Sequence, residues 1–196
     1  MAVVERVDDL KPAERILNAA SRLFCRDGIH ATGIDRIMAE AGAAKMTLYN
    51  QFGSKEALVE AVLKRESETW RAWFADALRQ AGDTPRDRLT ALFPVLRQWF
   101  ERQDYFGCAL MNAVAEYPKG EDQIRAVALA HKEGVGKVLR GLAVQAGCSD
   151  IDGLMQELTI LIDGAIIAAL IGRDPSAADV AGRIYRLVLP RYLPAA

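Results

Sequence analysis

Apolar residues recur along the chain at the three- and four-residue spacing of a helix face, and no stretch alternates with a period of two. This spacing predicts an all-helical protein, because a helix buries a stripe every 3.6 residues whereas a strand buries every second position. The first stripe starts at Pro12, which favours the first turn of a helix, and stops at Asp27 and Gly28. Two short helices are expected over about residues 32–41 and 44–51, and a long one over about residues 54–80.

Capping residues separate these helices. Thr32 and Asp35 form a capping-box pattern, Gly42 suits a left-handed helix end, and Ser54 can cap the long helix. Further helices are expected at about residues 85–103, with a kink at Pro94, and at about 106–117, 121–146, 151–171 and 176–189. We therefore expect an all-α protein of about nine helices, in which a small N-terminal module (residues 1–53) is joined to a larger helical domain (residues 54–196).

The two short helices carry the candidate chemistry. A pair of short helices joined by a tight turn with glycine is the plan of a helix-turn-helix, whose second helix enters the major groove of DNA. Leu48 and Phe52 are predicted to anchor this second helix in the core, while its other residues offer donors, acceptors or methyl groups. Lys55 stands at the start of the next helix, where free backbone N–H groups favour a phosphate. The predicted DNA-binding residues are Thr32, Gly33, Lys45, Met46, Thr47, Tyr49, Asn50 and Lys55.

Charge contributes little to this prediction. The net charge is -1, and residues 1–65 hold ten Lys and Arg against nine Asp and Glu. Only the local distribution is favourable, because residues 43–55 contain two lysines and no acid. A DNA-binding surface would therefore be a local patch on an almost neutral protein.

The same segment resembles a known family. Residues 32–58, with the sequence TGIDRIMAEAGAAKMTLYNQFGSKEAL, are similar to the N-terminal domain of the TetR/AcrR family. Thr47-Leu48-Tyr49, Phe52 and Lys55 match its pattern directly, as does the segment 19–24. This resemblance implies an all-helical homodimeric regulator, usually a repressor, which binds a double-stranded DNA operator.

Some positions depart from the family pattern. Ala44 stands where serine is common, Met46 where glycine is frequent, and Asn50-Gln51 where His-Tyr or Tyr-His is typical. These departures leave the expected fold intact and concern the DNA sequence that is preferred. The block of residues 106–117 also resembles one subgroup of the family.

Aromatic residues gather between positions 70 and 117, where they can line an apolar cavity or fill the core. The family resemblance implies that a small effector binds in this helical body. Asn112 and Glu116 are four residues apart on one helix face, and either bind the effector or pair with protein groups, as do Asp163 and His131. The predicted effector-binding residues are Trp70, Trp73, Phe74, Trp99, Cys108, Asn112, Glu116, Tyr117 and His131.

The last two helices have the composition of an interface. The first is apolar around most of its circumference, and Gly164 and Gly172 permit the close approach of a partner helix. Two such helices from each of two copies would form a four-helix interface with two-fold symmetry. The predicted dimer-interface residues are Leu154, Leu158, Leu161, Ile162, Ala165, Ala169, Val180, Ile184 and Leu187.

Other function classes find little support in the sequence. The three cysteines form no CxxC pair, so we expect no metal, and no cofactor is indicated. No secretory segment is recognisable, and the apolar run of residues 158–172 is shorter than a bilayer span, so we expect a cytoplasmic protein without a membrane segment. GxSxG, HExxH and phosphate-loop motifs are missing, which argues against an enzyme.

Our main hypothesis is a homodimeric repressor that a small apolar effector releases from a palindromic operator. An activator is a variant of this hypothesis. The alternative is a helical ligand-binding or protein-interaction module whose helix-turn-helix is vestigial.

Overall fold

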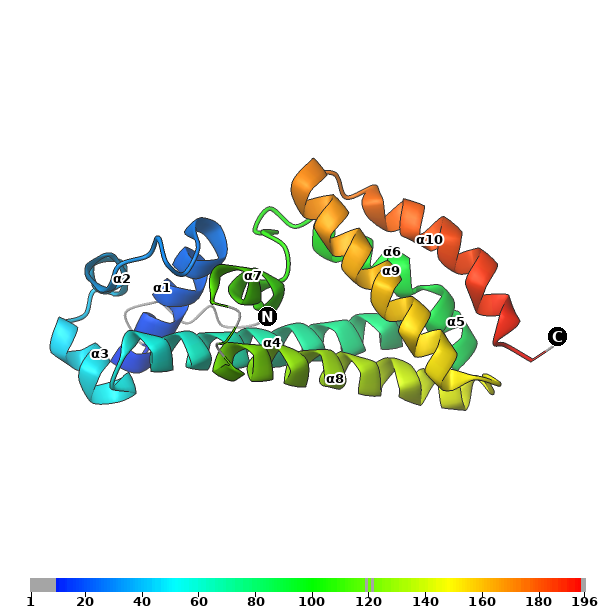
Figure 1. The fold of residues 1–196 in the computed structure, drawn as a ribbon, viewed down its shortest axis with the longest axis horizontal. Coiled ribbons are helices and arrows are strands. Elements are labelled where there is room, and N and C mark those ends of the chain that lie inside the picture. Colours follow the sequence, from blue (N-terminus) through cyan, green and yellow to red (C-terminus); the bar gives the residue numbers. More distant parts are fainter. Residues whose placement is uncertain (1–9, 119, 121, 195–196) are drawn as a thin grey trace. The chain divides into compact units, whose positions relative to one another are not determined.

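The structure is a computed structural model that describes residues 10–118, 120 and 122–194. These residues form α-helices and one short 3₁₀-helix, with no strand among them (Figure 1). The predicted all-helical class is therefore confirmed. The elements are α1 (Pro12–Asp27), α2 (Ile34–Ala41), α3 (Lys45–Phe52), α4 (Lys55–Gln80), α5 (Pro85–Thr90), α6 (Leu92–Phe100), α7 (Ala109–Glu116), α8 (Asp122–Gln145), α9 (Ile151–Gly172), α10 (Ala177–Val188) and η2 (Leu189–Arg191).

The chain divides into two compact units. Unit 1 comprises Met1–Glu68 and Ala109–Ala128, and unit 2 comprises Thr69–Cys108 and Leu129–Ala196. Helix α7 therefore belongs to the same unit as α1, α2 and α3, although it lies far from them in sequence. Helices α4 and α8 each contribute residues to both units.

The core of unit 1 is built from the apolar stripes of its helices. Ile16 and Leu23 of α1, Ile37 of α2, Leu48 of α3 and Leu58 of α4 are fully buried. Burial of a leucine or isoleucine side chain contributes roughly 1.5–3 kcal/mol, so these contacts hold the short helices α2 and α3, which could not persist alone. The predicted anchor Leu48 is confirmed, whereas Phe52 is only half-buried.

The predicted cap of α2 was wrong. The helix begins at Ile34 with Gly33 as its N-cap, and no side chain caps it. The hydroxyl of Thr32 instead donates to the carbonyl of Gly28 at 2.7 Å, because Thr32 is completely buried in the preceding loop. The other end is as predicted, since Gly42 adopts a left-handed conformation with φ of 58°.

The predicted helix of residues 85–103 is two helices, and its break does not fall at Pro94. It falls at Ala91, between α5 and α6, and Pro94 lies in the first turn of α6. Proline has no N–H to donate to the carbonyl four residues earlier, and its ring clashes with that carbonyl. For Pro94 this carbonyl belongs to Thr90, the last residue of α5. Pro94 then lies in the first turn of α6, where the backbone N–H groups have no partner within the helix, so its missing N–H costs no hydrogen bond.

Unit 2 contains a hairpin of two helices, α9 and α10, which run antiparallel in Figure 1. Tyr185 of α10 is buried against Phe93 of α6, with ring centroids 5.4 Å apart. Gly182 permits this contact, because a side chain there would press on Phe93. Helix α10 thus packs on both α6 and α9 within this unit.

Helix α9 is long and apolar enough to cross a membrane by length and composition, with a mean hydropathy of 1.9 over its most apolar window. The helix extends beyond the apolar run of residues 158–172, so its length alone does not argue against a span. Seven of its residues are buried, so one face of the helix packs inside unit 2.

Candidate nucleic-acid interface

Helix α3 presents a polar outer surface on a single buried anchor. Leu48 fixes the helix to the core, and Gly53 ends it. The residues predicted to contact DNA on this helix are exposed or half-buried: Lys45, Met46, Thr47, Tyr49 and Asn50. Met46 has two thirds of its surface exposed. The helix can therefore approach another surface without rearrangement.

Lys45 forms an ion pair with Asp35 of α2, with 2.9 Å between its ammonium nitrogen and the carboxylate. Both side chains are largely exposed. Exposed pairs of this kind contribute between zero and about 1 kcal/mol, so a phosphate or a base can displace Asp35 easily. The pair orients Lys45 along the surface of α2 and α3 without sequestering it.

Gly33 is exposed at the N-terminus of α2, as its predicted role requires. Thr32 is not available in the same way. Its hydroxyl donates to Gly28, and its backbone N–H donates to the carbonyl of Ile29 at 3.3 Å. We therefore correct the predicted role of Thr32 from a phosphate contact to an internal bond of the loop between α1 and α2.

Lys55 has a partner that the sequence did not indicate. Its ammonium donates to the carbonyl of Ile29 at 2.8 Å, so the first residue of α4 is bonded to the loop that precedes α2. This bond closes the base of the helix-turn-helix. The ammonium is half-buried and has two further protons, and the free N–H groups of the first turn of α4 lie beside it. Ser54 caps this turn through Ala57 at 3.0 Å, as predicted.

Comparison with known proteins agrees with this geometry. A sequence profile described as "Bacterial regulatory proteins, tetR family" matches residues 16–62. The HTH-type transcriptional regulator LmrA of Bacillus subtilis is 30% identical over 166 residues, which cover 82% of this chain and 87% of LmrA. This chain belongs to the TetR family of bacterial regulatory proteins.

The TetR-family fold extends over both units. A crystal structure of a TetR-family transcriptional regulator from Streptomyces coelicolor matches with a TM-score of 0.83 and 31% identity, covering 92% of this chain and 96% of that chain. The protein is therefore a DNA-binding transcriptional regulator of TetR type. Another relative, the HTH-type transcriptional activator FasR of Mycolicibacterium smegmatis, is 42% identical over 77 residues, or 39% of this chain and 35% of FasR. Family membership thus leaves the sign of regulation open.

In this TetR-family chain, the predicted effector residues separate into two groups. Unit 2 contains an aromatic cluster around Trp70, which stacks on Phe74 at 4.7 Å and meets Trp99 and His131 edge-on at 5.1 and 5.5 Å. Trp73 joins it at 6.0 Å. Cys108 is buried in the same unit. These predicted residues do lie together, and they join α4, α6 and α8.

His131 is neutral in this cluster. Burial, followed by the positive charges of Lys132 and Arg71, lowers the pKa of His131 to about 4. Lys132 also forms an ion pair with Asp163, the acid that interrupts the apolar stretch of α9. The interpretation of Asp163 as a residue with an internal partner is supported by this pair. Arg71 packs across Gly134 of α8, where an added Cβ would collide with it.

Asn112, Glu116 and Tyr117 lie in unit 1 and do not join the tryptophans within one unit. Asn112 and Glu116 line a cleft between α1, α4 and α7 of only about 10 Å³, which holds at most one water molecule. Glu116 and Tyr117 contact His30 instead. Glu116 therefore has an internal partner, which was one of its two predicted roles, and the effector role of Asn112 and Tyr117 stays a prediction.

The predicted dimer surface requires a correction. Ala165 is buried but lines a groove between α9 and α10. Leu154, Leu158, Ile162 and Ala169 are buried inside unit 2, because they face its core. They cannot present a surface to a partner. Leu161 is half-buried, and Val180, Ile184 and Leu187 are exposed as predicted.

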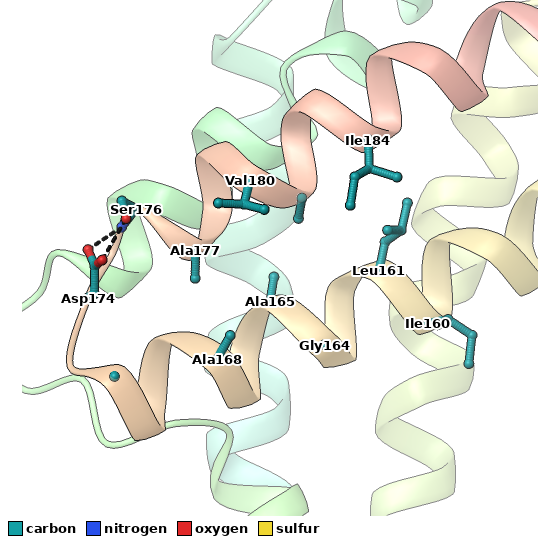
Figure 2. A pocket seen from close by; sticks show the side chains of 12 residues that line it. Ile160, Leu161, Gly164, Ala165, Ala168, Asp174, Ser176, Ala177, Val180 and Ile184 are labelled. Carbon is teal, nitrogen blue, oxygen red and sulfur yellow. Dashed lines mark hydrogen bonds between the residues drawn. The ribbon is translucent and has the colours of Figure 1, made fainter.

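The exposed apolar surface of the hairpin lies on a different face of α9 from these buried residues. A groove of about 410 Å³ runs between α9 and α10, and Figure 2 shows Leu161, Ala165 and Ala168 opposite Val180 and Ile184 along it. Ile160 and Ile171, each more than 70% exposed, extend the apolar face. The sequence missed these isoleucines, because α9 is apolar on nearly all sides and its pattern does not indicate which face is buried. We call this surface, formed by Ile160, Leu161, Ala168, Ile171, Val180, Ile184 and Leu187, the hairpin face.

In the part of the chain that the structure describes, no three His, Cys, Asp or Glu side chains gather as metal ligands do. The three cysteines are free thiols, and Cys108 and Cys148 are buried.

Proposed function

We propose that this TetR-family regulator is a cytoplasmic homodimer that represses transcription at a palindromic operator and is released by a small apolar effector. The observation that carries the proposal is the exposed polar surface of α3, held on Leu48 and bounded by Lys45 and Asn50. A helix with this surface fits the major groove, where lysine and asparagine read base edges and a methionine can touch a thymine methyl group. Gly33 and the remaining protons of Lys55 are the proposed phosphate contacts.

Dimerisation supports operator recognition. The hairpin face exposes several large apolar side chains on adjacent helices, which soluble monomers rarely do. A second copy of the same hairpin would cover this face in a four-helix arrangement with two-fold symmetry. Two α3 helices would then read half-sites about 34 Å apart, so the operator is expected to be palindromic.

The effector is proposed to bind at the aromatic cluster of unit 2. The indole N–H of Trp70 is buried there and has no acceptor among the described residues. An unsatisfied buried donor costs about 1–3 kcal/mol, which a ligand oxygen would recover. We propose Trp70, Trp73, Phe74, Trp99 and His131 as its lining, with Cys108 as a buried neighbour. Binding there would shift α4, which runs without interruption from this cluster to the end of α3.

DNA binding is tested by selection from a pool of random duplexes, followed by gel shifts with the recovered sequence. We expect a palindromic site that the Asn50→Ala variant binds more weakly. Failure of the wild-type chain to enrich any duplex would contradict the proposal. A reporter gene placed behind this site then gives the sign of regulation, and we expect expression to rise when the regulator is deleted.

Effector binding can be followed directly, because all three tryptophans of the chain lie in the aromatic cluster. A library of small aromatic compounds is screened for quenching of tryptophan fluorescence, with the Trp70→Phe variant as a control. By linkage, operator DNA must weaken the binding of a releasing compound by the same factor by which the compound weakens DNA binding. Independent binding of compound and DNA would contradict release.

A further inference from the structure

Helix α7 contacts the helix-turn-helix at one loop, formed by residues 28–33 between α1 and α2. A carboxylate oxygen of Glu116, the last residue of α7, accepts a hydrogen bond from the backbone N–H of His30 at 3.0 Å. The ring nitrogen Nε2 of His30 donates to the backbone carbonyl of Glu116 at 3.1 Å. The His30 ring also packs on Tyr117, with centroids 4.9 Å apart. Three contacts therefore join one end of α7 to one residue of the loop.

The backbone of the loop is adapted to this contact. Gly28 has a φ of 91°, a conformation that disfavours other residues, and an added Cβ would lie 3.2 Å from the Glu116 carboxylate. The carbonyls of Gly28 and Ile29 are bonded to Thr32 and Lys55. The His30 N–H is thus the group through which the Glu116 carboxylate of α7 fixes this loop, in which the carbonyls of Gly28 and Ile29 are bonded to Thr32 and to Lys55 of α4.

We infer that Glu116 is a positioning residue for DNA binding, which sets the placement of α2 and α3 by fixing the loop at His30. The inference rests on the proposed reading of DNA by α3. Helix α2 starts directly after this loop. Lys55, which begins α4 just beyond the end of α3, is bonded to the loop at Ile29. A loop released from Glu116 gives both helices more freedom, and DNA binding must then restrict that freedom again.

Whether removal of the Glu116 carboxylate weakens or strengthens DNA binding distinguishes a positioning role from a purely electrostatic one. Removal of a carboxylate makes the protein less negative, which by charge alone strengthens binding to DNA. Loss of the bond to His30 predicts the opposite. Glu116→Ala should therefore weaken binding to the selected operator about five- to tenfold, which lies within the range expected for one ordinary protein hydrogen bond. Glu116→Gln should restore it, because an amide oxygen also accepts from the His30 N–H.

Glu40→Ala is the matched control, since Glu40 is a carboxylate of α2 that pairs with Arg22 at the surface. This variant has the same change of charge and should not weaken DNA binding. His30→Ala, which keeps the backbone N–H but loses the ring contacts, should weaken it two- to threefold. Hydrogen exchange at the His30 amide should accelerate in Glu116→Ala and stay unchanged in Glu40→Ala.

The measurements are gel shifts with the selected operator duplex and hydrogen exchange, at a temperature where every variant is fully folded by circular dichroism. Operator binding by Glu116→Ala that equals or exceeds that of the wild type would overturn the inference, as would a Glu116→Gln variant as weak as Glu116→Ala. If wild-type protein enriches no duplex, the proposed function fails first. If Asn50→Ala weakens binding and Glu116→Ala does not, only the positioning role fails.

Discussion

Both units are built from packed helices, but unit 1 exposes a polar surface and unit 2 exposes an apolar one. Unit 1 exposes polar side chains on α3. The loop between α1 and α2 is held by hydrogen bonds that Thr32 and Lys55 donate and that Glu116 accepts. Unit 2 encloses an aromatic cluster and exposes the apolar hairpin face. Helix packing provides the core of both, so the difference lies in which residues are left outside. A polar face suits DNA, whereas an apolar face suits a second copy of the protein.

The largest effect is expected where a charge is placed on the hairpin face. Ile184→Asp should weaken dimerisation by at least about 1,000-fold, because burial of an unpaired carboxylate costs several kcal/mol and the symmetric interface contains two of them. Ile184 is about half exposed within the chain, so folding should be little affected. Sedimentation velocity measures the change in oligomeric state.

Leu129→Asp provides the control for this variant. Leu129 of α8 is an exposed leucine outside the hairpin face, and the same change there should leave the dimer intact. Equal dissociation of both variants, or of neither, would show that the hairpin face has no special role.

The aromatic cluster of unit 2 should make stability depend on pH. The pKa of His131 is about 4 in the folded chain and 6.5 in the unfolded chain, so between these values only the unfolded state binds the proton. Folding stability should therefore fall as the pH falls from 7 to 4.5, by roughly 2 kcal/mol from this group. Urea denaturation at both pH values should show a smaller difference for His131→Gln than for the wild type. If stability changes equally with pH in the two proteins, the pKa of His131 is not lowered by folding.

In unit 1, Lys55 is expected to contribute to DNA binding through its charge. Lys55→Ala should weaken binding to all DNA sequences by about eightfold per subunit at 0.1 M salt, and should reduce the salt slope by about 0.9 per subunit. Thr32→Val removes a neighbouring loop bond without a change of charge. It should lower stability by about 1 kcal/mol and leave the salt slope unchanged. If both variants keep the wild-type slope, Lys55 only closes the base of the helix-turn-helix.

The effects on nonspecific DNA binding should be smallest at the residues that choose bases. Lys45→Ala or Asn50→Ala should change the sequence recovered by selection and weaken binding to the original operator by about 1–3 kcal/mol. Nonspecific binding should be nearly unchanged for Asn50→Ala. Lys64→Ala, which removes a lysine paired with Glu60 on α4, should leave the selected sequence unchanged. An unaltered preference in all three variants would make Lys45 and Asn50 backbone contacts.

Local sequence signals predicted the helices well where a single residue decides the geometry. Gly42 ends α2 in the left-handed conformation, and Ser54 caps α4, because these roles depend on only a few neighbouring atoms. The signals failed where a distant group competes. Thr32 resembles an N-cap in sequence, but its hydroxyl donates a hydrogen bond to the carbonyl of Gly28.

Contacts between distant segments were beyond the reach of pattern analysis. Nothing in the sequence pairs Glu116 with His30 across 86 positions, or Lys55 with Ile29. The face of α9 that is buried was also hidden, because apolar residues cover most of the circumference of that helix. The predicted effector residues Trp70, Phe74, Trp99 and His131, in contrast, do lie together. The tryptophans and Phe74 were singled out because aromatic residues gather between positions 70 and 117.

The lack of a side chain at Gly134 affects the protonation of His131, because Arg71 packs across this glycine. In the middle of a long helix, replacement of glycine by alanine ordinarily stabilises a protein by about 1 kcal/mol. Here the added methyl group would displace the guanidinium of Arg71, whose charge helps to keep His131 neutral one turn earlier on α8. A substitution that improves the helix would thus loosen the electrostatic control of the cluster, so selection for stability and selection for an effector site would act on Gly134 in opposite directions.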